Sequence, residues 1–203
     1  NSESTIKNAL KSVSRLKLAQ HQLIYELVIV DDGSVDATLL MWKKLIKKKD
    51  KTTCRLIHQK HKGPVQALNA GIRVAKGRYI FILDADDEFV PGTTLAEMEK
   101  LLTTQPESGF VYGDYYEKDI KTGYITYISL QNNIFNSVAG GILFTTKLIK
   151  EIGMYDENLI FPEYDVLMKI QKKYQGVHLP KPVFIYKRHT GSITANEQRG
   201  ALG

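Results

Sequence analysis

The feature that most constrains the fold is a regular alternation of strand-like and helix-like patterns in the first half of the chain. Short apolar runs at 25–30, 54–58 and 78–83 have the length of buried strands. Between and after them, residues 2–18, 36–48, 63–75 and 94–102 carry apolar side chains at helical spacing. Strands and helices that alternate in this way form mostly parallel sheets covered by helices. The sequence therefore predicts an α/β fold with a mostly parallel central sheet.

The second half of the chain follows a different pattern. Residues 109–116 and 124–129 have the pattern of two strands joined by the turn Lys121-Thr122-Gly123, which predicts a small antiparallel element. The remaining predicted elements are a loop with Gly140 and Gly141, helices at 146–152 and 162–174, and a last strand at 183–187. Because no linker separates the two patterns, we expect a single domain over 1–203, made of the halves 1–113 and 114–203.

The start of the chain departs from the alternation. A helical pattern opens within the first residues, with no strand before it. In alternating α/β folds the first strand commonly lies in the middle of the sheet. We therefore expect that this sequence lacks the first strand of its fold.

Composition fits a folded domain and argues against nucleic acid as a partner. Hydrophobic residues make up 43% of the 203 residues, and no apolar run approaches the roughly 20 residues of a membrane span. The net charge of +6 includes a lysine run at 43–49, but Trp42 and Leu45 recur there at helical spacing. The lysines are therefore interpreted as the solvated face of a helix, which can still attract anionic lipid at a membrane surface. The single Cys54 excludes an internal disulfide and fits a cytoplasmic protein.

An acidic cluster follows the predicted strand at 78–83. Asp84, Asp86 and Asp87 stand within four residues of one another, where like charges repel. Side chains two residues apart on a strand point to the same side, so Asp84 and Asp86 can face one spot. A divalent cation there would turn repulsion into attraction, and carboxylate oxygens suit Mg²⁺ or Mn²⁺. The cluster predicts a site for a metal and a phosphate compound.

A second acidic pair, Asp31 and Asp32, ends the predicted strand at 25–30. A turn with Ser34 and a helix follow, and Ser34 or Asp36 is expected to cap that helix. Capping accounts for one polar residue but not for two adjacent acids. Ligands of open α/β sheets bind beyond the carboxyl ends of the strands. Two acidic strand ends in one parallel sheet would lie along the same edge, which predicts a shared site.

Two further residues in the second half are candidates for chemistry. Glu163 stands in the first turn of the helix at 162–174, where the helix dipole also favours acids, so a general base and a purely structural acid are both open interpretations. Asp165 in the same turn is expected to hold local structure. His189 follows the last strand in a polar loop, which predicts an accessible imidazole.

Taken in order, the motifs resemble family 2 glycosyltransferases, which have the GT-A fold. The resemblance rests on residues 31–36, 67–72, 77–80, 83–87, 140–141, 152–157 and 186–193. It covers nearly the whole chain, and it is specific as an ordered set although each motif alone is loose. It implies an inverting transfer of a sugar from a nucleotide-sugar, expected to be a UDP-sugar, to an acceptor hydroxyl.

The resemblance also implies roles for residues at the donor side. Asp32 is similar to the family carboxylate that contacts uracil, with Asp31 beside it. Lys62 lies where the family approaches the nucleotide, and Asp84 is similar to a ribose and donor contact. A saccharide or a lipid-linked molecule is the implied acceptor, used in polysaccharide or cell-surface glycan synthesis in the cytoplasm or at the inner face of the cell membrane. The sequence leaves the oligomeric state open.

The resemblance also implies metal ligands and a catalytic base. Asp86 resembles the ligand of Mg²⁺ or Mn²⁺ in the family's DxD motif, with Asp84 beside it. His189 is similar to a histidine that contacts metal or diphosphate. Glu163 takes the place of the catalytic base, and acceptor selection is expected around Asp114, Gly140-Gly141 and the helix from 162.

Several positions depart from the family pattern. The family carries its base in a Glu-Asp pair where this chain has Pro162-Glu163, and an arginine of the following helix is Lys169 here. Asn1 stands where the family's first strand has just ended. A non-catalytic module that binds a nucleotide-sugar or glycan on the same fold is therefore an alternative. A phospho-receiver domain, indicated by Asp31-Asp32 at a strand end, is a weaker one because its spacing does not fit.

Overall fold

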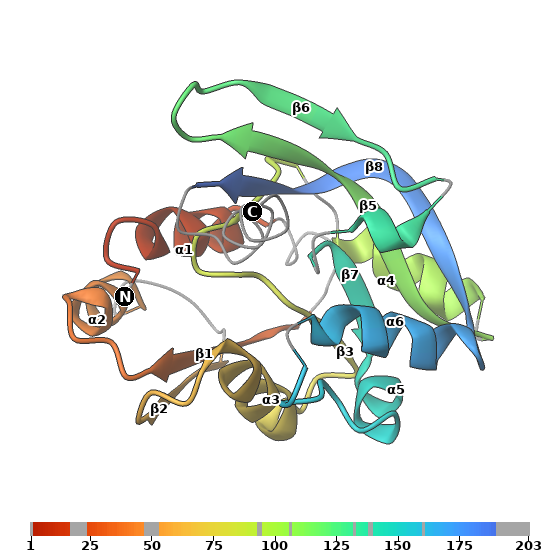
Figure 1. The fold of residues 1–203 in the computed structure, drawn as a ribbon, viewed down its shortest axis with the longest axis horizontal. Helices are drawn as coiled ribbons and strands as arrows, with labels where there is room; N and C mark the ends of the chain where they lie inside the picture. Colours follow the sequence, from red (N-terminus) through yellow and green to blue (C-terminus); the bar gives the residue numbers. More distant parts are fainter. Residues whose placement is uncertain are drawn as a thin grey trace, which may run out of the picture.

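The computed structural model describes residues 2–16, 24–46, 53–92, 95–105, 107–131, 133–137, 140–159 and 161–189. Within them, helices flank β-sheet as the alternation predicted (Figure 1). In chain order the elements are α1 (Ile6–Ser14), β1 (Glu26–Asp32), α2 (Thr38–Ile46), β2 (Thr53–Gln59), α3 (Pro64–Val74), β3 (Tyr79–Phe81), β4 (Glu88–Phe89), α4 (Leu95–Thr104), β5 (Ser108–Asp119), β6 (Ile125–Ile128), the short helix η2 (Ile134–Asn136), β7 (Ile142–Thr145), α5 (Thr146–Glu151), α6 (Pro162–Gln171) and β8 (Gln175–Arg188).

The strands form a two-stranded and a six-stranded sheet. β1 pairs with β2 in parallel, and the larger sheet runs β3-β7-β5-β8-β4, with β6 paired to β5. In the larger sheet β5 and β8 are parallel, whereas the other described pairs are antiparallel. The predicted α/β fold and the antiparallel β5–β6 hairpin are confirmed. The larger sheet has more antiparallel pairs than expected, because the chain returns through the short strands β4 and β7.

Strand β8 differs most from its prediction. It spans 14 residues, whereas the apolar pattern predicted only 183–187. Its pairing with β5 passes from Gly113 opposite Leu179 to Asp114 opposite Pro182, so two residues of β8 bulge out of the ladder. A proline has no backbone N–H to donate and normally ends a central strand, but a bulge accommodates it. Pro180 and Pro182 thus lie within one long strand.

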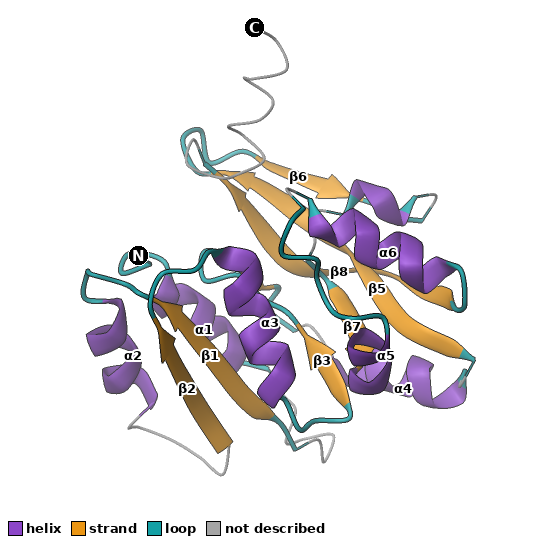
Figure 2. Cartoon of the chain, turned by 60° about the horizontal axis from the view of Figure 1, so that its bottom comes forward, coloured by secondary structure: helices purple, strands orange, loops and turns teal. Residues whose placement is uncertain are grey.

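Alternation along β5 divides the core into two clusters, one on each face of the larger sheet. Phe110 packs in a cluster with Ile72 of α3 and with buried residues of α5 and α6. Its neighbour Val111 packs in the other cluster, with Met98 of α4. Because β5 is buried on both faces, the sheet is a firm support for the loops at its edge. Figure 2 shows β1 and β3 pointing in the same direction, so the loops that follow them leave on the same side.

The predicted helices are confirmed with small changes at their ends. The helix expected at 2–18 is described as α1, and residues 17–18 lie outside the described residues. In α2, Lys43 and Lys44 are exposed as expected for a solvated face, while the lysines at 47–49 and the capping residue Thr94 lie outside the described residues. Among the helices in the described part of the chain, none combines the length and apolar character of a membrane span.

Candidate active site

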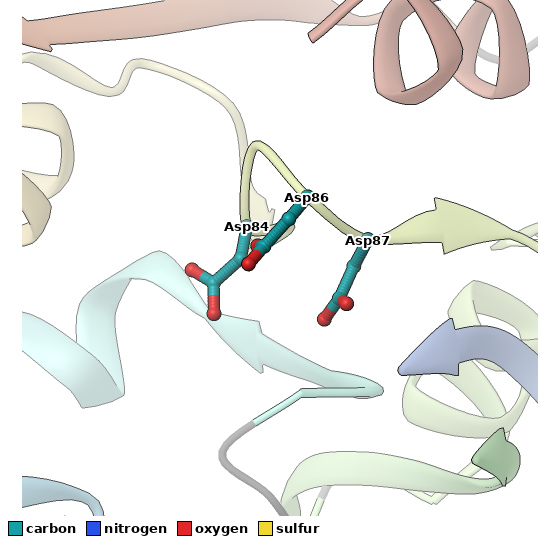
Figure 3. A group of neighbouring side chains, drawn as sticks. All are labelled: Asp84, Asp86 and Asp87. Carbon is teal, nitrogen blue, oxygen red and sulfur yellow. The ribbon is translucent and has the colours of Figure 1, made fainter. Parts of the chain in front are cut away.

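Three aspartates in the loop between β3 and β4 form the centre of the candidate site. Side-chain oxygens of Asp84, Asp86 and Asp87 lie within 4.8 Å of one another and project toward the same region (Figure 3). The backbone N–H of Asp87 donates to the carbonyl of Asp84 at 3.1 Å, which closes a turn. The predicted meeting of Asp84 and Asp86 is confirmed, although a turn brings them together and not the alternation of a strand, since β3 already ends at Phe81.

The electrostatics of this cluster favour a bound cation. Asp84 keeps an exposed surface, but the protein atoms around it desolvate the carboxylate and raise its pKa to about 6, and the charges of Asp86 and Glu163 add to the rise. Burial raises the pKa of Asp87 to about 8, with further contributions from Asp84 and Asp86. Three hard oxygen donors that repel one another fit Mg²⁺ or Mn²⁺, because a divalent cation would neutralise the repulsion.

The end of β8 lies against the cluster. His189 Nε2 is 2.9 Å from Asp86 Oδ2, and the backbone N–H of Lys187 donates to Asp87 Oδ1 at 3.0 Å. The ammonium group of Lys187 pairs with Glu88 of β4. The structure thus brings His189 to the aspartate predicted as a metal ligand, and its own role at a metal stays a prediction.

Glu163 approaches the cluster from the start of α6. Pro162 occupies the first turn, where its missing N–H is not needed, and Glu163 follows it. The charge of Glu163 contributes to the raised pKa of Asp84, so the two carboxylates interact electrostatically. Asp165 pairs instead with Lys169 one turn along the helix, as expected for a residue that holds local structure. The assignment of Glu163 as a base stays a prediction.

The acids at the end of β1 are held by protein donors. Asp32 accepts hydrogen bonds from the Gln59 side chain at 2.7 Å and from the backbone N–H groups of Lys62 and Gly63 at 2.8 and 2.9 Å. Burial acts to raise the pKa of Asp32, but these hydrogen bonds outweigh it and lower the pKa below its usual value. The structure therefore brings Asp32 and Lys62 together, through the backbone of Lys62.

Asp31 points into the protein at the same strand end. Its side chain is buried, and Oδ2 lies 2.6 Å from Nδ1 of His58 on the neighbouring strand β2. Its second oxygen accepts from the N–H of Ser34 at 3.3 Å. Asp36 caps the start of α2 by accepting from the N–H of Thr38, as expected. The contacts of Asp31 and Asp32 with a nucleotide stay predictions.

Asp114, around which acceptor selection was expected, lies in the interior of the protein. Asp114 is buried and accepts hydrogen bonds from Tyr127, from the N–H of Leu130 at 2.7 Å and from His178, whose Nε2 lies 2.7 Å away. Burial acts to raise the pKa of Asp114, but the hydrogen bonds lower it below its usual value. The carboxylate of Asp114 is therefore buried and joins β5, β6 and β8, and acceptor selection around Asp114 stays a prediction.

Gly140 and Gly141 lie against the ring of Phe184. A Cβ at either glycine would stand 2.7 Å from that ring, so the pair is required for close packing. Gly141 also has a φ of 75°, in the region that favours glycine. This contact explains the glycine pair without an acceptor. Ala139 lies outside the described residues.

Two residues near the site escaped the sequence analysis. Tyr155 is buried, and burial together with the charges of Asp84 and Glu163 raises the pKa of its phenol, which places the hydroxyl near both acids. Asn69 of α3 is 2% exposed; it donates to the carbonyl of Tyr155 at 2.8 Å and accepts from its N–H at 3.1 Å. We call this pair of hydrogen bonds between Asn69 and the backbone of Tyr155 the clamp. The one signal for it in the sequence was a polar residue on the inward face of α3.

A cavity of about 350 Å³ adjoins the clamp between α3 and the loop after α5. Asn69, Arg73, Tyr155 and Lys169 are among its lining residues, whereas the aspartates of the cluster and Glu163 are not. Arg73 and Lys169 are already paired with acids there. The chemistry therefore centres on the carboxylates and not on this cavity.

Comparisons with known proteins agree with the geometry. The family pattern described as "Glycosyl transferase family 2" matches residues 1–154. The glycosyltransferase GlyG of Streptococcus pneumoniae is 29% identical over 96% of this chain and 71% of its own length. The Escherichia coli protein WfaP, named a UDP-Glc:alpha-D-GlcNAc-diphosphoundecaprenol beta-1,3-glucosyltransferase, is 30% identical over 94% of this chain and 76% of its own length.

Solved structures show the same GT-A fold. TarS of S. aureus in complex with UDP-GlcNAc superposes with a TM-score of 0.75 at 18% identity, over 96% of this chain and 58% of TarS 1–349. The mannosyltransferase PcManGT of Pyrobaculum calidifontis, with GDP-Man and Mn²⁺, gives 0.73 at 20% identity, over 97% of this chain and 57% of that one. The chain thus spans less than two thirds of these solved structures.

Proposed function

Because this chain belongs to glycosyl transferase family 2, we propose that it moves a sugar from a nucleotide-sugar to an acceptor hydroxyl in a metal-dependent reaction with inversion at the anomeric carbon. The observation that carries the proposal is the aspartate cluster, on which the charge of Glu163 acts. Oxygens of three aspartates lie within 4.8 Å of one another, and Glu163 raises the pKa of Asp84 from the facing helix. A general base beside a cation site is what displacement of a diphosphate requires.

The proposed donor is a UDP-sugar. The name of WfaP, a relative that the chain matches over most of its length, contains UDP-Glc, which supports this choice. TarS with UDP-GlcNAc supports it only through the fold, since its identity is 18%. Asp31 and Asp32 would lie at the base and ribose end of the donor, with Lys62 beside them.

The aspartate cluster would hold Mg²⁺ or Mn²⁺. Asp86 and Asp84 are the proposed ligands, with Asp87 behind them and His189 at the side of Asp86. A divalent cation bound there supplies charge neutralisation for the leaving diphosphate. The residues present fit this role, because they are hard oxygen donors whose mutual repulsion a cation removes. Mn²⁺ in the PcManGT structure is a property of that protein.

The chemistry proposed for Glu163 is proton removal. The acceptor hydroxyl attacks the anomeric carbon, a new C–O bond forms on the face opposite the nucleotide, and the bond between that carbon and the diphosphate oxygen breaks. The hydroxyl proton passes to the Glu163 carboxylate, and the nucleoside diphosphate leaves with the bonding electrons. Holding acceptor and donor in line lowers the barrier further.

The proposed acceptor is a saccharide or a lipid-linked saccharide. A lipid-linked acceptor is supported by the name of WfaP, which contains diphosphoundecaprenol. Such an acceptor would place the work of this protein at the inner face of the cell membrane, with polysaccharide or cell-surface glycan as the product. A non-catalytic binding module on the same fold is the competing candidate, because the chain has Pro162-Glu163 where the family has an acidic pair.

Substitution of Glu163 by glutamine separates the two candidates. Release of UDP from UDP-glucose in the presence of Mn²⁺ measures turnover, and the UDP-dependent rise in melting temperature measures donor binding. We expect Glu163→Gln to slow UDP release by about 10²–10⁴-fold while keeping the thermal response to UDP. Glu151→Gln, an exposed glutamate at the end of α5, is the matched control and should match the unsubstituted protein. Full turnover by Glu163→Gln would refute the base, and no turnover by any form would favour the binding module.

A further inference from the structure

Three aromatic side chains gather beside Glu163. We call Phe161 and Tyr164 at the start of α6, together with Phe135 of η2, the aromatic patch. The ring centroid of Tyr164 lies 6.3 Å from that of Phe135 in a stacked arrangement. It lies 6.0 Å from that of Phe161 in an edge-on arrangement. Because each ring touches the next, the patch is held in shape before any ligand arrives.

The patch has one side on the core and one side in solvent. Phe135 packs against the buried cluster of α3, α5 and α6. Phe161 and Tyr164 keep 38% and 39% of their surface exposed. Large rings that stay exposed as a group, next to a candidate site, mark a surface on which another molecule binds.

The position of the patch favours the acceptor side of the reaction. Tyr164 directly follows Glu163 in the first turn of α6, and Phe161 precedes that turn. A base must lie within hydrogen-bond reach of the acceptor hydroxyl. A ligand on the patch would therefore present its hydroxyl groups at Glu163.

The chemistry of the patch indicates a sugar ring. An aromatic ring presents a flat apolar face with a negative quadrupole, and the C–H face of a pyranose is apolar with slightly positive hydrogens. Apart from Glu163, the charged side chains of α6 are Asp165 and Lys169, which neutralise each other in an ion pair. The surface is therefore suited to a neutral ligand and not to a diphosphate.

We propose that the aromatic patch is an acceptor subsite that stacks against the C–H face of a neutral sugar ring and presents its hydroxyl group to Glu163. This inference rests on the proposed function and adds the residues that hold the acceptor sugar. The apolar residues Leu159 and Met168, which are 43% and 52% exposed, extend the surface beyond the rings. They would suit a lipid tail, but they lie further along the chain from Glu163 than Phe161 and Tyr164 do.

Binding of simple glycosides tests the subsite. The probes are the methyl glycosides of glucose, galactose and N-acetylglucosamine, and the octyl glycoside of N-acetylglucosamine, titrated by NMR in the presence of UDP and Mn²⁺. We expect Tyr164→Ala and Phe161→Ala to weaken binding of at least one methyl glycoside about tenfold, which corresponds to about 1.4 kcal/mol. Tyr164→Phe should restore binding, because the ring and not the hydroxyl makes the contact.

Two controls make the result decisive. Tyr124→Ala removes an exposed tyrosine from the turn between β5 and β6, and it should leave glycoside binding as it was. The UDP-dependent rise in melting temperature shows whether each variant is folded with an intact donor site. If the unsubstituted protein does not respond to UDP, the proposed function fails and not only the subsite.

Three outcomes with an intact response to UDP would overturn the subsite. The first is that none of the methyl glycosides binds the unsubstituted protein. The second is that Tyr164→Ala and Phe161→Ala bind them as well as the unsubstituted protein does. The third is that the two substitutions weaken only the octyl glycoside, which would assign the surface to a lipid tail.

Discussion

At the scale of single residues, the raised pKa values of Asp84 and Asp87 predict how the site responds to pH. Both values, about 6 and about 8, lie above the usual carboxyl value of 3.8, so protonation stabilises the folded protein. That stabilisation is complete below about pH 4 and is lost as pH rises through about 6 and then about 8. A cation binds the deprotonated carboxylates and should reverse the loss.

The prediction is tested by melting temperatures with and without Mn²⁺ between about pH 5 and pH 9. Through these two groups, the melting temperature of the metal-free protein should fall as pH rises, while the increase caused by Mn²⁺ should grow. Asp87→Asn is the matched variant, because it removes the group whose pKa is about 8 and should flatten the upper part of the curve. An increase in melting temperature with Mn²⁺ that has the same size at every pH would contradict this prediction.

The residues that could be predicted are those whose role follows from their place at a strand end or helix start. Asp84 and Asp86 meet, but through a turn and not through the strand alternation that their spacing indicated, while His189 lies against Asp86 and the charge of Glu163 acts on Asp84 from distant segments. Their convergence could be expected only through the resemblance to a family, since no periodicity brings residues 84 and 189 together. The burial of Asp114 could not be foreseen, because it depends on donors from β6, from the loop after β6 and from β8.

At the scale of elements, the link between α3 and the loop after α5 predicts a large effect for a small change. Asn69→Ala would remove three hydrogen bonds, one of them to the Glu157 side chain, and leave the buried backbone N–H and carbonyl of Tyr155 without this partner. Unpaired buried groups cost about 1–3 kcal/mol each, so we expect the free energy of unfolding to fall by about 2–4 kcal/mol. Urea unfolding measures this change.

Asn8→Ala is the control for this prediction. Asn8 is an exposed asparagine within helix α1, and its replacement should change the free energy of unfolding by less than about 0.5 kcal/mol. The clamp would be refuted if Asn69→Ala and Asn8→Ala had equally small effects.

Elements with a clear period were predictable, and short or irregular ones were not. The helices α3, α5 and α6 have apolar residues on one face and were found close to their predicted bounds. β4 has two residues and β7 has four, which is too short for a pattern to be distinguished from a loop. The length of β8 was hidden by two prolines, because the bulge that accommodates them depends on the partner strand β5.

At the scale of the whole molecule, the two halves of the sequence contribute different parts of one site. Residues 31–32, 62 and 84–87 come from the alternating first half, while Glu163 and His189 come from the second half. The larger sheet joins the loop of residues 84–87 to the second half, because β3 pairs with β7 and β4 pairs with β8. Asp31 and Asp32 lie on β1 in the two-stranded sheet, so this pairing does not hold them.

The central claim is that the aspartate cluster holds a divalent cation which in turn binds the diphosphate of a nucleotide. Calorimetric titration of UDP into the protein, with and without Mn²⁺, tests it most directly. The account predicts that UDP binds much more tightly with Mn²⁺ and that Asp86→Asn abolishes this difference. UDP binding that is equally strong without Mn²⁺, or a Mn²⁺ effect that persists in Asp86→Asn, would contradict it.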